Sequence, residues 1–206
     1  MLRYSRPLPP DDIFAAPPPV FRPAPDLAAW IADVFISSAG PLANAQHDVL
    51  QYALIGCLWT NARFEKAGGF RVAGQAERPN FDGPAWTRAR QEFQMLEWFG
   101  AIPDFILTFD AVVGLEADDR RWCALVDHEL RHCVQAKSKK DGQPRFTRDG
   151  RPVFALVGHD VEEFVDVLSR YGAGSCAGKT VDFTAAAATP PLVAEALITA
   201  ACGRDP

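Results

Sequence analysis

Apolar and polar positions follow two different periods along this chain, and each change of period marks a predicted boundary between elements. In several segments, apolar residues recur at intervals of three and four, which is typical of a helix with one face on a core. In residues 44–64, Leu50, Leu54 and Leu58 form such a stripe. The pattern predicts helices over residues 27–36, 44–64, 84–99, 161–170 and 190–201.

Segments rich in β-branched and aromatic residues separate these helices and favour strands. We expect strands over 70–76 and 104–110, and two short ones over 143–147 and 152–157, next to Asp-Gly turns. Residues 104–110 lead into a further helix, which starts after the acidic residues 116–119 and carries Trp122, Val126 and Leu130 on one stripe. Together, these elements predict an α+β fold with a small mixed sheet packed on helices.

Proline content divides the chain. Residues 1–25 hold eight of the 17 prolines, which predicts an extended and poorly ordered arm. The remainder, 26–206, has the length of one domain and is long enough to bury a core without disulfides.

Composition narrows the class of protein. The net charge of −5 argues against a general affinity for nucleic acid. No apolar run approaches the roughly 18 residues that a membrane helix needs, and no apolar stretch follows Met1–Arg6 as in a signal peptide. The five cysteines have no framework spacing, which favours free thiols in a reducing cytoplasm.

The strongest chemical signal is the HExxH pattern from His128 to His132. On a helix, positions four apart lie one above the other, so both imidazoles can bind one metal ion while Glu129 lies beside them. Zinc with two histidines and a third protein ligand leaves a position for water, whose pKa falls to about 7. The spacing therefore predicts zinc-dependent hydrolysis of a peptide bond, with His128 and His132 as ligands and Glu129 as general base.

A third ligand is expected from the segment 158–164, which follows the second Asp-Gly turn. If Val161 and its apolar neighbours face the core, His159 and Glu163 share the opposite side and could each face the metal. His159 is favoured because it would explain why three of the four histidines fall in this region. Glu162 and Glu163 remain alternatives, as does the absence of a third protein ligand.

Other polar residues have simpler interpretations. His47 is expected at a helix surface or cap, and Cys133 in a helix core. Residues 174–180 lack the glycine spacing of a phosphate loop. The candidates for stabilising an oxyanion are Arg131 and Tyr171, and those for orienting a ligand imidazole are Asp127 and Asp160.

Cations are concentrated between Lys137 and Arg151, where six of them accompany only two acidic residues. A solvated hairpin is the simpler explanation of this segment. A weak contact with nucleic acid phosphates is the alternative.

Three segments together resemble the putative phage metallopeptidase family, which is similar to SprT-like zinc proteases. They are Asp-His-Glu-Leu-Arg-His at 127–132, the strand at 103–110, and Gly-His-Asp-Val-Glu-Glu-Phe at 158–164 followed by Arg-Tyr-Gly at 170–172. The resemblance implies a zincin-like fold, zinc bound by His128, His132 and His159, and Glu129 as the base. It also implies a phage or prophage origin, which would place the protein in the cytoplasm of a host cell.

From the sequence, we expect a cytoplasmic zinc endopeptidase that acts on a protein or peptide. One alternative is a binding module that keeps zinc for stability and docks through its proline-rich arm. The other is an SprT-like protease of DNA-associated proteins. The oligomeric state does not follow from the sequence.

Overall fold

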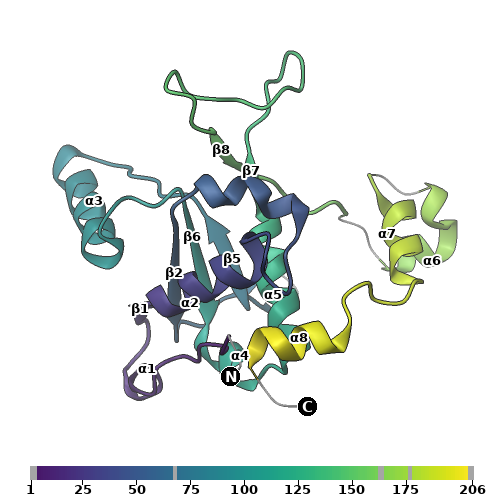
Figure 1. Cartoon of the computed structure of the whole chain (residues 1–206), viewed down its shortest axis with the longest axis horizontal. Coiled ribbons are helices and arrows are strands. Elements are labelled where there is room, and N and C mark those ends of the chain that lie inside the picture. Colours follow the sequence, from purple (N-terminus) through teal and green to yellow (C-terminus); the bar gives the residue numbers. More distant parts are fainter. Residues whose placement is uncertain (1–3, 67–68, 162–164, 176–177, 204–206) are drawn as a thin grey trace.

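A four-stranded mixed sheet forms the centre of the computed structural model, which describes residues 4–66, 69–161, 165–175 and 178–203 (Figure 1). β2 and β6 run parallel, while β1 and β5 pair antiparallel at the two edges. This architecture confirms the predicted α+β class with a small mixed sheet. Across the sheet, the order is β1 (Phe21–Pro23), β2 (Ile55–Thr60), β6 (Phe105–Asp110) and β5 (Gly74–Glu77).

The prediction of a single helix over residues 44–64 is wrong for the second half of this segment. A 3-10 helix, η2 (Ala45–Tyr52), is followed by the central strand β2. β2 pairs on both edges, and all but its first residue is buried, so its side chains form a continuous apolar run. Over six residues, such a run cannot be told from a buried helix by periodicity alone.

The helix that carries HExxH, α5 (Asp119–His132), packs its predicted apolar stripe against this sheet. Trp122 stacks on Trp59 of β2 with ring centroids 5.3 Å apart, and lies 5.1 Å from Phe109 of β6. The Asp118 side chain caps the helix by accepting a hydrogen bond from the Arg121 backbone N–H. A short helix, α4 (Ala111–Glu116), connects β6 to α5.

The proline-rich segment, expected to be a poorly ordered arm, packs onto the domain from residue 4 onward. It contains α1 (Asp12–Ala15) and the edge strand β1, and Ile13 is fully buried in the core. Arg6 donates to the Ala117 carbonyl at 3.0 Å and pairs with Asp119 at 3.1 Å. Proline is tolerated here because an edge strand need not supply every N–H to a ladder.

Two predicted helices are confirmed, with different surroundings. α2 (Pro25–Ile31) continues as a π-helical turn, η1 (Ala32–Ile36), and both contribute to the core. α3 (Ala85–Phe99) projects to the left in Figure 1, and its C-terminal half packs on the sheet, where Met95 is buried with Leu58 of β2 and Ile106 of β6. Of its aromatic residues, Trp86 is 83% exposed and Phe93 is also exposed, whereas Trp98 and Phe99 pack against this cluster.

The strand predicted over 152–157 is present in shorter form as β8 (Phe154–Leu156), but its partner is β7 (Cys133–Gln135) and not the strand predicted over 143–147. Gly142 and Gly150 adopt positive φ in the predicted turns between them. A second small ladder joins β3 (Glu65–Lys66) to β4 (Phe70–Arg71).

The C-terminal region leaves the body of the protein and then returns to it (Figure 1). Cys202 near its end lies with its Sγ 3.6 Å from that of Cys123 on α5. The sequence did not predict α7. Among the described helices, none has both the length and the apolar character needed to cross a membrane. The elements are α6 (Val165–Tyr171), η3 (Ala173–Ser175), α7 (Thr180–Ala187) and α8 (Glu195–Cys202).

Candidate metal centre

The last turn of α5 presents two imidazoles on one side of the helix. The Nε2 atoms of His128 and His132 lie 3.3 Å apart, as the four-residue spacing predicts. His128 is exposed and His132 is half-buried. Both rings are therefore accessible from solvent.

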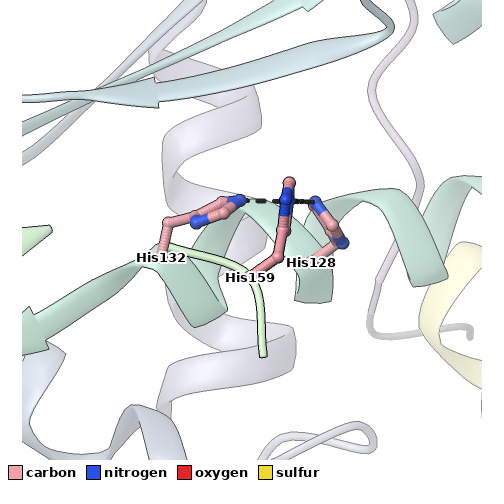
Figure 2. A group of neighbouring side chains, drawn as sticks. All are labelled: His128, His132 and His159. Carbon is pink, nitrogen blue, oxygen red and sulfur yellow. Dashed lines mark hydrogen bonds between the residues drawn. The ribbon is translucent and has the colours of Figure 1, made fainter. Parts of the chain in front are cut away.

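A third imidazole, that of His159, joins them from the loop after β8 (Figure 2). Its Nε2 lies 3.1 Å from that of His128, and one nitrogen from each of the three rings falls within 4.8 Å of the others. We call His128, His132 and His159 the histidine cluster. The structure thus brings together all three residues that the sequence singled out as metal ligands.

Strand pairing explains how His159 reaches this position from 27 residues beyond His132. β7 starts directly after α5 and pairs antiparallel with β8, so that Cys133 lies opposite Leu156. The pairing continues one residue further, because the Val157 backbone N–H donates to the His132 carbonyl at 2.9 Å. His159 follows two residues later and is therefore returned to the end of α5.

A second hydrogen bond to Val157 fixes the tautomer of His132. Its Nδ1 lies 2.7 Å from the Val157 carbonyl oxygen, which can only accept a hydrogen bond. Nδ1 must therefore carry the proton, and Nε2 of the neutral ring directs its lone pair into the histidine cluster. Metal-binding histidines are commonly oriented by such a bond from their other nitrogen.

The cluster fits a tetrahedral metal ion. Zinc binds histidine nitrogens at about 2.0–2.1 Å, which places neighbouring ligand atoms of a tetrahedron about 3.3 Å apart. The two measured Nε2 separations, 3.3 and 3.1 Å, are close to this value. Burial, followed by the nearby His132 and His159, lowers the pKa of His128 and so favours the neutral ring that a metal requires.

Glu129 lies beside the cluster and is buried, with 4% of its surface exposed. Burial raises the pKa of this carboxyl, and this effect outweighs the opposing influence of His132, of the Ala76 backbone N–H and of Lys66. Among the described residues, Glu129 forms no ion pair. It is therefore a carboxylate that can take up a proton more readily than usual.

Gly74, at the start of β5, makes room for Glu129. A Cβ atom at this position would lie 2.9 Å from Oε1 of Glu129 and 3.0 Å from its Cγ. Sequence reasoning missed this residue. The signal was a glycine inside a predicted strand, which often marks the close approach of another group.

A pocket of about 780 Å³, here called the site pocket, opens over the histidine cluster and Glu129. One wall is the chain from Arg71 to Ala76, which includes the edge strand β5, and Lys66 adds a cation. A second pocket of about 520 Å³ lies against the same three histidines and is bordered by Arg131, Asp160 and Phe183. Both volumes lie in the range typical of small-molecule and peptide sites.

Asp127 and His47 form a contact that sequence reasoning did not anticipate. His47 is fully buried, in contrast to the expected surface position, and its Nε2 lies 2.6 Å from Oδ1 of Asp127. Asn44 donates to the same oxygen at 3.3 Å and caps η2. No hydrogen bond joins Asp127 to a ligand imidazole in the described structure, so its predicted orienting role is not supported by this geometry.

The remaining candidates lie at varying distances from the cluster. Asp160 pairs with Lys179 at 2.9 Å, and Arg131 is exposed beside the second pocket. Tyr171 is exposed and lines neither pocket. Cys133 is buried as predicted, and burial raises its pKa to about 12. Glu162 and Glu163, the alternative third ligands, lie outside the described residues.

Comparison with known proteins places the chain in a family. The family model described as putative phage metallopeptidase matches residues 28–189, which is most of the chain, so the protein belongs to this family. This confirms the resemblance read from the sequence. Neither the comparison with curated proteins nor that with solved structures found a match.

Proposed function

We propose that this member of the putative phage metallopeptidase family is a zinc-dependent endopeptidase with a zincin-like domain. In this proposal, His128, His132 and His159 bind zinc and Glu129 is the general base. The proposed domain includes the proline-rich segment, since Arg6 of that segment bonds to Gly114 of α4 and Asp119 of α5.

The observation that carries the proposal is the convergence of three Nε2 atoms beside a buried carboxylate at the wall of a pocket. Three protein ligands around a tetrahedral ion leave one position free, as in catalytic zinc sites. Structural zinc sites usually have four protein ligands. The donor set therefore favours catalysis over a purely structural role.

Bound zinc would supply Lewis acidity, which lowers the pKa of a water molecule and polarises a peptide carbonyl. In this proposal, the Glu129 carboxylate would take a proton from the attacking water and pass it to the departing amine. Its raised pKa suits this exchange, because a base must later release the proton as an acid. Gly74 allows the carboxylate to stay in position without a clash.

The edge strand β5 offers a place for an extended peptide. It pairs with β6 on one side only, and residues 72–76 form a wall of the site pocket. An extended substrate can add to such an edge through backbone hydrogen bonds. We propose that the substrate is a protein or peptide held along this strand, with its scissile bond over the histidine cluster.

The state of the cysteines is consistent with a reducing compartment. Cys57, Cys123, Cys133 and Cys202 are buried thiols that form no disulfide in the described structure. Free buried thiols are typical of cytoplasmic proteins. We propose that the protein acts in the cytoplasm, which would be that of the host if a phage encodes it.

The test is cleavage of an unbiased peptide library by the full chain, with zinc, with chelator, and with zinc restored after chelation. We expect cleavage that chelator abolishes and zinc restores, along with about one zinc per chain by metal analysis. Failure of the protein to bind a transition metal, or cleavage that persists in chelator, would refute the proposal.

A further inference from the structure

The connection between β7 and β8 is a two-lobed loop, here called the basic arm and defined as residues 137–151. It extends away from the sheet at the top of Figure 1. Its first lobe turns at Gly142 and its second at Gly150, both with positive φ. Isolated bridges between Lys137 and Pro144 and between Phe146 and Pro152 close the two lobes.

Backbone hydrogen bonds hold the basic arm in shape, although it buries almost nothing. At its base, Arg145 donates to Ala136 at 2.8 Å and accepts from Val153 at 3.0 Å. Residues 139–151 are all exposed, and the arm contributes no side chain to the buried core. Packing therefore does not explain the composition of the arm.

Charge distinguishes the basic arm from the rest of the chain. It holds six of the 21 cations and two of the 26 acidic residues, so its net charge is +4 in a chain of −5. Both acids are engaged locally, since Asp149 pairs with Arg151 at 3.0 Å and Asp141 accepts from the Gln143 backbone N–H at 3.2 Å. Within the described residues, the remaining cations form no ion pair. They are Lys137, Lys139, Lys140, Arg145 and Arg148.

An exposed aromatic ring lies among these cations. Phe146 is 59% exposed, follows Arg145 in the chain and stands at the base of the second lobe, where it bridges to Pro152. A ring of this kind can stack on an unpaired base, while neighbouring lysines and arginines bind phosphates. An anionic membrane would instead require a larger apolar face than one phenylalanine provides.

We propose that the basic arm is a docking site for single-stranded nucleic acid, with Arg145 and Arg148 binding phosphates and Phe146 stacking on a base. This function is independent of zinc and of peptide hydrolysis. The arm joins β7, which follows His132, to β8, which precedes His159. Nucleic acid bound to the arm would therefore be connected to the histidine cluster through these two strands.

The test is fluorescence anisotropy of the full chain with labelled oligothymidylate and oligouridylate of about 20 nucleotides, which exceeds a typical site size. Arg145→Ser/Arg148→Ser should weaken binding at least about 10-fold and make the slope of log affinity against log salt shallower by about 1.4, the value for two phosphates on a single strand. Phe146→Ala should weaken binding about 5- to 150-fold, the effect of one lost stack, with the slope unchanged.

A matched control is Arg88→Ser/Arg90→Ser on α3, which removes two exposed arginines elsewhere. It should leave the affinity within about twofold, since surface charges outside the contact add little to it. Tighter binding of uridylate or of thymidylate would identify RNA or DNA as the preferred strand, and either supports the proposal. Equal losses in the arm and control variants, preference for duplex, or binding to phosphatidylserine vesicles but not to oligonucleotides would overturn it. Peptide cleavage is not measured here, so either proposal can fail without the other.

Discussion

The two sides of α5 near its end use the same kinds of group, a carboxylate and an imidazole, in opposite ways. Asp127 and Glu129 flank His128, and helix geometry points them about 200° apart. Glu129 is buried beside the exposed histidine cluster, and its pKa is raised. Asp127 is half-exposed and pairs with the fully buried His47, and its pKa is lowered.

Hydrogen bonds account for the difference. Burial by itself would raise the pKa of Asp127, but hydrogen bonds from His47 and Asn44 and the charge of His47 outweigh it. The Nδ1 atom of His47 is buried with no partner among the described residues, so Asp127 is the partner that holds this ring through Nε2. On one side of the helix, hydrogen bonds thus hold a carboxylate and lower its pKa, while on the other side burial raises the pKa of a carboxyl.

The largest effect is expected from His159→Ala, on the side of the histidine cluster. Loss of one of three nitrogen ligands should largely abolish zinc retention and cleavage, measured by metal analysis and peptide assay. Asp160→Asn is the matched control and should keep zinc, because this carboxylate faces Lys179. Full zinc content in His159→Ala would show that the third ligand is another residue. Zinc loss in Glu162→Ala or Glu163→Ala would then identify that residue.

The second-largest loss of activity is expected from Glu129→Gln. The amide cannot accept a proton from water, so kcat should fall about 10²- to 10⁴-fold, while zinc content stays at the wild-type level. The corresponding change on the other side, Asp127→Asn, should leave kcat within about 10-fold, because Asp127 lies outside the site pocket. Comparable losses in the two variants would show that the two carboxylates do not have separate roles.

A smaller loss is expected from Gly74→Ala. The added methyl group would displace Glu129, and a shift of about 1 Å in a catalytic group can cost about 10²-fold in rate. Zinc content should not change. Gly174→Ala is the control and should be fully active, because no described atom beyond its chain neighbours lies within 4 Å of the added Cβ. An active Gly74→Ala enzyme would mean that the position of Glu129 is not critical.

The smallest effect on catalysis is expected from His47→Ala, which should instead reduce stability. Removing a fully buried ring leaves a cavity, so the free energy of unfolding should fall by about 2–4 kcal/mol, measured by urea denaturation. Zinc affinity should change less than about 10-fold, because no described contact joins His47 to a ligand. Loss of zinc without loss of stability would show that the two sides of α5 are coupled.

Local patterns were enough for several parts of the fold. The amphipathic stripe through Trp122 and Leu130 predicted α5, and Pro84 marked the start of α3. The predictions failed where the apolar pattern of an element depended on which distant segment packs against it. The apolar run of β2 was taken for part of a helix, and α3 reaches the sheet only through its C-terminal half, so that Trp86 near its start is exposed.

The sequence by itself determined the pair His128 and His132 with Glu129 between them, because the helical repeat converts a spacing of four into one face of α5. Only the tertiary structure decided what surrounds them. His159 reaches the other two rings through the pairing of β7 with β8, and His47 and Gly74 contact the helix from distant segments. The physical reason is range: periodicity reports on residues within a few turns, whereas strand pairing and burial depend on segments that the folded chain alone brings together.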